Sequence, residues 1–228
     1  MSAARERGAG AIPAPDRDCP LCPRLVEFRQ RQRHAHGDWH NAPVPSFGDL
    51  DARLLIVGLA PGLKGANRTG RPFTGDFAGD LLYGTLKKFG FARGSYEAGP
   101  DDGLTLIDCR ITNAVRCVPP ENKPTPDEIA TCRSFLAATI KEMSRLRAIV
   151  ALGRVAHDTF IAAQEARRAD YPFSHGCAQT IGAITLFDSY HCSRLNTNTG
   201  VLTPQMFRDV FAQVRQCLDG PAVTAEVP

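Results

Sequence analysis

Residues 53–76, RLLIVGLAPGLKGANRTGRPFTGD, contain the pattern that decides the fold. The apolar run at 53–58 ends in a glycine and predicts a short buried strand, and a loop dense in glycine follows it at once. Residues 148–153, AIVALG, repeat the apolar run with its terminal glycine. Continuous apolar runs of this length are typical of a parallel sheet that is covered on both faces.

Helical patterns alternate with the strand candidates along the rest of the chain. The further strands are expected at 111–115 and 183–187, and the helices at 77–89, 126–146, 155–164 and 204–218. This alternation predicts an α/β fold: a single domain with a central, mostly parallel four-stranded sheet flanked by helices on both faces. Sheets of this kind bind ligands at the carboxyl ends of their strands, so the loops that follow the strands should carry the chemistry.

The helix at 126–146 has the clearest start. Thr125, Pro126 and Glu128 stand at the positions of a capping box, with proline in the first turn where its missing N–H costs nothing. Cys132 lies on the apolar face of this helix, a short distance from its first turn.

The composition is that of a soluble globular protein, with 43% hydrophobic and 22% charged residues among 228. Residues 1–15 and 219–228 lack periodicity, so we expect one domain over residues 16–218 between two tails. Lys and Arg outnumber Asp and Glu by 27 to 24, a mild excess that suits a polyanionic partner without identifying it. The sequence shows neither a signal-peptide core nor an apolar run of bilayer length, which predicts a cytoplasmic protein with no membrane partner.

Eight cysteines in a cytoplasmic protein favour metal binding over disulfides. Cys19 and Cys22 have the spacing of two ligands of one metal centre, and Cys117 and Cys132 follow far along the chain. Four thiolates could hold zinc or a [4Fe-4S] cluster, while the alternative is that Cys117 and Cys132 are small buried hydrophobes. The other cysteines show no ligand spacing and are expected in the core or without a role: Cys109, Cys177, Cys192 and Cys217.

The loop at 58–76 combines backbone N–H groups with cations, as a site for a phosphate or a base would, although it lacks the ending of a Walker loop. Phe73 is either a stacking surface for a base or a plug for the core. Asp76 is either a catalytic carboxylate or the N-cap of the following helix. In the loop at 190–200, His191 can donate a hydrogen bond to an oxygen that gains charge, or it is simply solvated.

Four ordered motifs together resemble the family 5 (type b) uracil-DNA glycosylases. They are the Cys-x-x-Cys at 19–22, GLAPGLKGANRTGRPFTGD at 58–76, ITNAVRCVPPENKPTPDEIATC at 111–132 and SYHCSRLNTNTGVLTPQMF at 189–207. The resemblance spans most of residues 19–210. It implies a uracil-DNA glycosylase-like catalytic domain over 16–218 and an iron-sulfur loop in which the matching cysteines hold a [4Fe-4S] cluster: Cys19, Cys22, Cys117 and Cys132.

The same resemblance implies roles for the residues at the strand ends. His191 would donate to the departing base, and Asp76 would orient water or stabilise the developing cation. The residues implied at the base are Asn113, which reads its edge, Phe73, which stacks on it, and Gly58 and Ala60. The residues implied at the DNA are Arg68, Arg71, Ser193, Arg194 and Leu195, the last as a wedge in the gap that the flipped base leaves.

The expected function is hydrolysis of the N-glycosidic bond of uracil in double-stranded DNA by base flipping, which leaves an abasic site. No lysine stands where a Schiff base would form, so we expect a monofunctional enzyme without strand cleavage. We also expect the enzyme to be a monomer. Leu59 and Ala60 stand where related families place a polar group, which predicts a roomy pocket that also accepts hypoxanthine. Residues 191–194, HCSR, replace the His-Pro-Ser-Pro of several related families, so the loop loses two prolines and gains a cation.

The main rival is a non-catalytic iron-sulfur or zinc protein that binds nucleic acid and in which His191 is structural. An electron-transfer protein is a weaker alternative. A zinc deaminase is excluded, because the sequence lacks the His-x-Glu and Pro-Cys-x-x-Cys elements of that class.

Overall fold

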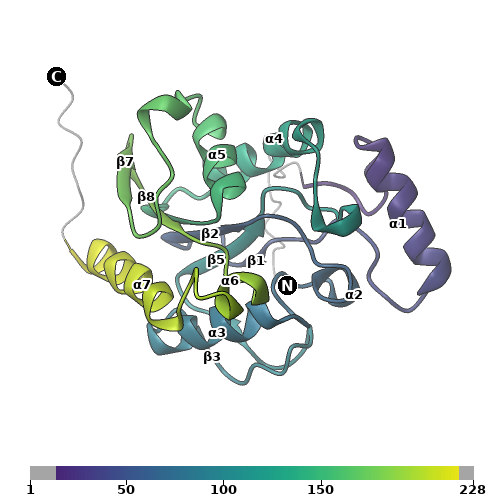
Figure 1. The fold of residues 1–228 in the computed structure, drawn as a ribbon, viewed down its shortest axis with the longest axis horizontal. Helices are drawn as coiled ribbons and strands as arrows, with labels where there is room; N and C mark the ends of the chain where they lie inside the picture. The colour runs from purple at the N-terminus through teal and green to yellow at the C-terminus, as the bar shows by residue number, and fades with distance from the viewer. Residues whose placement is uncertain (1–13, 221–228) are drawn as a thin grey trace, which may run out of the picture.

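The central sheet has six strands in the order β1-β5-β2-β6-β8-β7 (Figure 1). The computed structural model describes residues 14–220. The strands are β1 (Phe47–Gly48), β2 (Leu54–Gly58), β5 (Cys109–Asn113), β6 (Ala148–Leu152), β7 (Ala178–Ile181) and β8 (Ile184–Ser189). β5, β2, β6 and β8 are parallel, and β1 and β7 pair antiparallel at the two edges.

The prediction of a four-stranded sheet is therefore wrong in strand number, although all four predicted strands are present at its centre. β1 has only two residues and β7 is the short polar run AQTI, so neither carries the apolar pattern that marks a buried strand. A small second sheet pairs β3 (Ala92–Arg93) with β4 (Thr105–Leu106). The sheet is mixed, with its antiparallel pairs confined to the edges.

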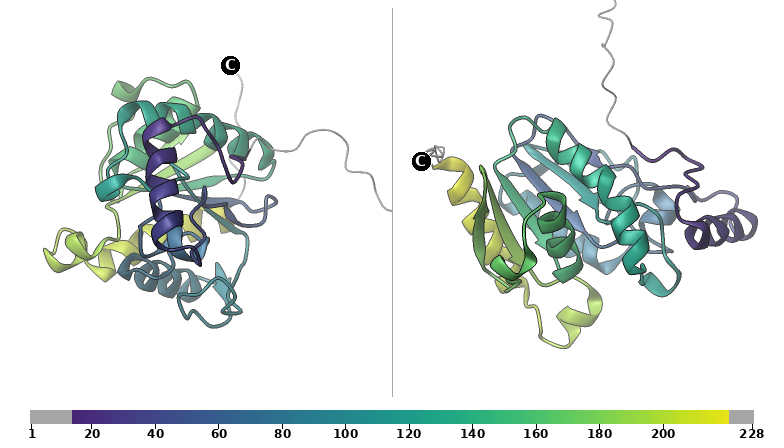
Figure 2. Two further views of the ribbon diagram at one scale, coloured as in Figure 1. Left: turned by 90° about the vertical axis from the view of Figure 1, so that its right-hand side faces the viewer. Right: turned by 90° about the horizontal axis from the view of Figure 1, so that it is seen from above.

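Helices cover both faces of the sheet (Figure 2). Leu54 and Ile56 of β2 face a core that includes side chains of α3 (Phe77–Lys88) and α7 (Pro204–Asp219). The alternate residues Leu55 and Val57 face a second core shared with α4 (Pro126–Glu142) and α5 (Arg154–Ala163). The period of two along a strand thus divides one apolar run between two cores.

The predicted capping box of α4 is confirmed: the Thr125 hydroxyl accepts from the Glu128 backbone N–H, and the Glu128 carboxylate accepts from that of Thr125. The helix ends at Glu142, four residues before the predicted end at 146, because the chain turns at Met143 and packs Leu146 back into the core. The other predicted elements agree with the structure to within one or two residues at each end.

Helix α1 (Pro23–Ala35) lies at one side of the molecule, outside the two helical layers (Figure 1). Its mostly polar sequence gives no amphipathic pattern, and it was not predicted. Also not predicted are α2 (Ala66–Thr69) and α6 (Arg194–Asn198), and the 3₁₀ turns η1 (Pro120–Asn122) and η2 (Arg168–Asp170). The predicted tails at 1–15 and 219–228 lie largely outside the described residues, and α7 continues to Asp219.

Across residues 14–220, no helix has the length and apolar character required to cross a bilayer. The parallel strands β2, β5 and β8 end at the same edge of the sheet. The loops that follow them therefore meet there.

Candidate active site and cysteine pocket

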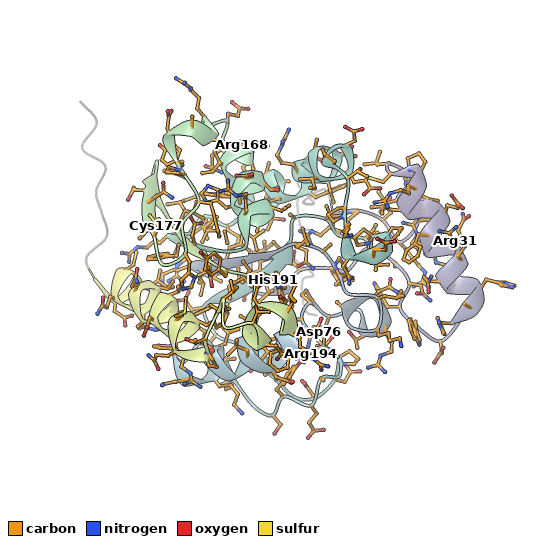
Figure 3. The ribbon with its side chains drawn as sticks, in the orientation of Figure 1. Arg31, Asp76, Arg168, Cys177, His191 and Arg194 are labelled. Carbon is orange, nitrogen blue, oxygen red and sulfur yellow. The ribbon has the colours of Figure 1, made fainter. Side chains whose placement is uncertain are left out.

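One pocket at the carboxyl edge of the sheet contains most of the residues predicted at the reaction. Figure 3 shows His191, Asp76 and Arg194 close together near the middle of the view. The pocket encloses about 270 Å³ of empty space, part of it open to solvent. Its walls are Ala60, Pro61, Gly62, Ala66, Phe73, Asp76, Ala78, Asn113 and His191. Segments up to 131 residues apart in sequence, from Ala60 to His191, are thus brought together by the strand ends.

Gly58 allows the amide of Asn113 and the ring of Phe73 to share one wall of this pocket. A Cβ atom on Gly58 would lie 2.4 Å from Asn113 Oδ1 and 2.6 Å from Phe73 Cζ. Both distances are far below van der Waals contact, so any side chain here would displace a neighbour. Gly58, predicted at the base, therefore makes room for the two groups that line the pocket, which are 4% and 6% exposed respectively.

Two tyrosines hold the backbone that presents Phe73. Phe73 has φ +56°, a left-handed conformation that non-glycine residues seldom adopt without support. The Tyr96 hydroxyl donates to the Phe73 carbonyl at 3.0 Å, and the Tyr83 hydroxyl donates to the Pro72 carbonyl at 2.6 Å. Phe73 is thus both buried in the core and part of the pocket wall, so the two alternatives for it are compatible.

Arg71 was predicted to contact DNA, and the structure corrects this. Its guanidinium is 4% exposed and forms a two-pronged pair with Asp102, at 2.8 and 2.7 Å. The rings of Phe47, Tyr83 and Tyr96 pack around it at 5.1 to 5.9 Å. The hydrogen bonds from Arg71 hold the pKa of Asp102 well below its usual range. Arg71 therefore anchors the loop before Phe73 from inside the protein and has no free face for a phosphate.

His191 lies two residues beyond β8, and its ring centroid is 6.1 Å from that of Phe73. Burial lowers the pKa of His191 to about 4, so the imidazole is neutral near pH 7. The Asn196 side chain donates to the His191 carbonyl at 2.8 Å and fixes the loop on that side. A neutral ring in this position offers one N–H to the pocket.

Asp76 is the N-cap of α3, as one of its two predicted roles requires. Its Oδ1 accepts from the Gly79 backbone N–H at 3.1 Å. Its Oδ2 faces the glycine loop, where a Cβ on Gly62 or Gly65 would lie 3.4 or 2.9 Å away. The protein around this carboxylate raises its pKa through desolvation, although the side chain reaches solvent through the pocket. One oxygen caps the helix and the other remains available to the pocket.

The remaining predicted DNA residues lie at the rim. Leu195 is 71% exposed, more than any other large apolar side chain in residues 14–220. Arg194 is exposed, with its guanidinium 5.6 Å from the centroid of the Phe77 ring, and Arg68 is exposed beside Gly75. Ser193 caps α6 by accepting from the Asn196 backbone N–H.

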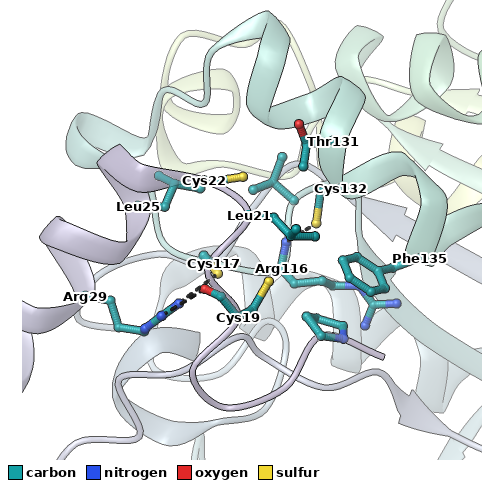
Figure 4. Close-up of a pocket in the computed structure, with 12 residues that line it drawn as sticks. Cys19, Leu21, Cys22, Leu25, Arg29, Arg116, Cys117, Thr131, Cys132 and Phe135 are labelled. Atoms are coloured by element: carbon teal, nitrogen blue, oxygen red, sulfur yellow. Dashed lines mark hydrogen bonds between the residues drawn. The ribbon is translucent and has the colours of Figure 1, made fainter. Parts of the chain in front are cut away.

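A second pocket contains the four predicted metal ligands, Cys19, Cys22, Cys117 and Cys132 (Figure 4). It lies between α1 and α4, encloses about 330 Å³ of empty space, part of it open to solvent, and is otherwise lined mainly by apolar side chains such as Leu25 and Phe135. Within residues 14–220, no three Cys, His, Asp or Glu side chains converge closely enough to hold a single metal ion. The four thiols surround a space instead of meeting at a point.

Two buried arginines that the sequence interpretation missed face this pocket. Arg29 is 3% exposed and donates to Cys117 Sγ at 3.7 Å and to the Cys19 carbonyl at 3.0 Å. Arg116 is 4% exposed; its backbone N–H donates to Cys132 Sγ at 3.3 Å, while its guanidinium donates to the hydroxyls of Ser46 and Thr139. In the described part of the chain, neither guanidinium pairs with a carboxylate. Arg29 lies one helical turn after Leu25 on the buried face of α1, but in a mostly polar segment an arginine at that spacing gives no signal of burial.

The thiols of this pocket are poor acids in their present surroundings. Burial raises the pKa of Cys22 to about 11 and that of Cys117 to about 12. Such thiols remain protonated near pH 7 unless a metal displaces the proton. Of the other cysteines, Cys109 and Cys192 are buried in the core, as expected, and Cys177 and Cys217 are partly exposed.

Comparison with known proteins places these two pockets in context. The family model of the uracil DNA glycosylase superfamily matches residues 45–215. A type-5 uracil-DNA glycosylase of Thermus thermophilus is 44% identical over 204 residues, which cover 87% of this chain and 93% of that protein. A type-5 uracil-DNA glycosylase of Mycobacterium leprae is 42% identical, with 92% and 96% covered. A type-4 uracil-DNA glycosylase of Thermotoga maritima is 41% identical over 119 residues, which cover 52% of this chain and 54% of that protein.

Proposed function

The chain belongs to the uracil-DNA glycosylase superfamily, and from this premise we propose that it is a DNA repair glycosylase that removes uracil from double-stranded DNA. The observation that carries the proposal is the pocket in which His191, Asp76, Asn113 and Phe73 meet. These groups provide a donor for a departing base, a carboxylate for water, an amide for a base edge and a ring for stacking.

The base enters this pocket after extrusion from the duplex. Inside a helix, its glycosidic bond is inaccessible to groups this deep, so flipping is required. The Asn113 amide both donates and accepts, which matches the neighbouring acceptor and donor on the edge of uracil. Phe73 provides the stacking surface. Leu195 at the rim would fill the vacated position in the stack, and Arg68 and Arg194 would contact phosphates.

The reaction breaks the bond between C1′ of the sugar and N1 of uracil. The pair of electrons leaves with the base, and negative charge accumulates on its O2 atom. The N–H of neutral His191 donates to this oxygen and is strongest when the charge is greatest, which stabilises the transition state. Water then adds to the cationic C1′, and the free oxygen of Asp76 accepts its proton. The proton that Asp76 took from water passes through solvent to N1 of the uracil anion, which completes release of uracil, restores the carboxylate and leaves an abasic site.

We propose that the cysteine pocket holds a [4Fe-4S] cluster and not a single zinc ion. Four thiolates around a space suit a cluster in which each sulfur binds a different iron, whereas zinc requires all four to converge. The buried guanidinium of Arg29, which donates to Cys117 Sγ, would offset part of the negative charge of such a centre. Cys19, Cys22, Cys117 and Cys132 would hold the cluster, which would join α1 to α4 and to the segment after β5.

The small side chains in the pocket walls support a substrate range beyond uracil. Ala60, Ala66 and Ala78 line its walls with methyl groups only. We therefore propose that hypoxanthine also enters. The proposal of a broad substrate range would be wrong if the enzyme removed uracil opposite guanine but released no hypoxanthine.

The decisive experiment measures free uracil released from a labelled duplex by wild-type protein and by His191→Ala. We expect release by the wild type without strand cleavage, and a rate lower by about 10²- to 10³-fold in the variant, the range for loss of an oxyanion donor. Equal, measurable rates would remove His191 from the mechanism, whereas no release by the wild type would favour a non-catalytic nucleic-acid-binding protein with a structural His191. Iron analysis of the same preparation tests the cluster.

We also propose that the enzyme is monomeric and cytoplasmic. Gel filtration tests whether it is a monomer.

A further inference from the structure

A second histidine, His157, lies in the core behind the loop that carries His191. It is 1% exposed, and each of its ring nitrogens meets an oxygen: Nδ1 lies 2.7 Å from Asp188 Oδ1, and Nε2 lies 2.8 Å from the Tyr171 carbonyl. A carbonyl oxygen only accepts, so Nε2 carries a proton and the remaining proton is shared between Nδ1 and Asp188. Burial lowers the pKa of His157, but the bonds to Asp188 and Tyr171 raise it, and the net shift is upward.

Asp188 fastens a separate segment, residues 171–177, to the end of β8. Its Oδ2 accepts from the Ser174 backbone N–H at 3.3 Å. Its backbone carbonyl accepts from the Gly176 N–H at 2.8 Å, and its own N–H donates to the Cys177 carbonyl at 3.0 Å. We call residues 171–177 the strap. His157 thus holds the beginning of the strap and Asp188 its remainder.

The strap reaches the residue directly before His191. The Tyr190 N–H donates to His175 Nδ1 at 3.1 Å, and the two rings stack with centroids 4.9 Å apart. The Gly153 N–H donates to the Ser189 carbonyl at 2.7 Å. In residues 14–220, no group hydrogen-bonds the imidazole of His191. Its direction therefore depends on the backbone anchors on either side, at Tyr190 and at the carbonyl held by Asn196.

We propose that the His157–Asp188 pair is a positioning device for the reaction: it holds the strap against β8 and so directs His191 into the pocket. His157 does not touch the base, so it acts only through His191. This role rests on the proposed glycosylase function. It differs from a purely structural role in its prediction that the rate of base release falls while DNA affinity stays the same.

The test is uracil release at saturating enzyme in a single turnover, with His157→Gln as the variant. Glutamine fills a similar volume, but its single amide group cannot bond at once to Asp188 Oδ1 and to the Tyr171 carbonyl, which lie on opposite sides of the histidine ring. We expect the rate constant to fall by about 10- to 100-fold, as for a misplacement of about 1 Å, and the enzyme concentration for half-maximal rate to change by less than about twofold. Phe160→Leu on the same helix is the control: it should lower the melting temperature with little effect on the rate constant.

A double-mutant comparison separates the possible outcomes. In a His191→Ala background, His157→Gln should cause no further loss of rate, because the two residues act as one unit. A multiplicative loss, or a wild-type rate in His157→Gln, would overturn the proposal. If His157→Gln does not fold, His175→Ala at the partly exposed end of the strap gives the same comparison with a smaller loss. A wild-type protein that releases no uracil would overturn the proposed function itself.

Discussion

The base pocket and the cysteine pocket lie on either side of one short segment, since Asn113 ends β5 and Cys117 follows four residues later. The base pocket is open, with a carboxylate that reaches solvent and a neutral histidine. The cysteine pocket is lined mainly by apolar side chains, with three partly buried cysteines, a buried Cys132 and two buried arginines. The side chains of the base pocket must be open to a substrate, so they depend on neighbouring residues for their position. The cysteines hold segments of the fold together, and that role needs no access for a substrate.

The largest expected effect breaks the cysteine pocket while leaving the base pocket in place. Cys22→Ser combined with Cys132→Ser should abolish iron binding and lower the free energy of unfolding by about 2 to 5 kcal/mol, the range for loss of a native cross-link. Cys177→Ser, outside the pocket, is the control and should retain iron. Iron analysis and denaturant unfolding measure both, and a doubly substituted protein of wild-type stability would contradict the scaffold role.

The next prediction breaks the base pocket without touching the cysteines. In Gly58→Ala, the new methyl group would overlap Asn113 Oδ1 and the Phe73 ring and displace one of them. We expect the rate of uracil release to fall by about 10²-fold with the iron content unchanged. Gly84→Ala on α3 is the matched control, because an added Cβ there meets nothing within 4 Å. A fully active Gly58→Ala would show that the shared wall is not required.

A smaller effect separates the two roles of Asp76. Asp76→Ser keeps a side-chain oxygen for the Gly79 N–H but removes the charge, and it should reduce the rate with little change in melting temperature. Asp76→Ala removes both and should also cost about 1 kcal/mol in the free energy of unfolding. Thermal unfolding and single-turnover rates distinguish them, and equal rates for Asp76→Ser and the wild type would leave Asp76 only a cap.

The smallest effect concerns pH. Burial lowers the pKa of His191 from an ordinary 6.5 to about 4, so its neutral form persists through pH 6.5 and the rate of uracil release should show no step there. Because the folded pKa lies below the unfolded one, protonation favours unfolding, and stability should fall as pH drops from about 6.5 toward 4. His191→Ala should lack that part of the fall in acid unfolding curves. A change in the rate of uracil release near pH 6.5 that is absent from His191→Ala would contradict the proposal that His191 acts as a neutral donor.

The predictable features of the fold were local ones. The apolar runs at β2 and β6 and the capping box of α4 are each contained in a few adjacent residues, and all three are confirmed. Arg71 could not be assigned correctly, because its partner Asp102 lies 31 residues away and a buried loop arginine looks like a free one in sequence. The strap had no signal at all, since its bonds are mostly made by backbone atoms.

The same limit applies to the site. The resemblance pointed to side chains that line the base pocket, but not to those that hold them, such as Tyr83, Tyr96 and His157. A residue that reacts belongs to a short motif, whereas its support comes from whichever segment the fold places beside it. The pairing of His157 with Asp188 depends on the packing of α5 against β8, which no local pattern encodes.

The alanine walls of the base pocket make substrate range the trait that is easiest to alter in this enzyme. Ala60, Ala66 and Ala78 each contribute one methyl group, and replacing any of them with valine, a single-nucleotide change, would narrow the opening. Phe73 and Gly58 offer no such freedom, because one is fixed by its backbone and the other by its neighbours. Selection can therefore change which damaged bases are removed and leave the chemistry of removal intact.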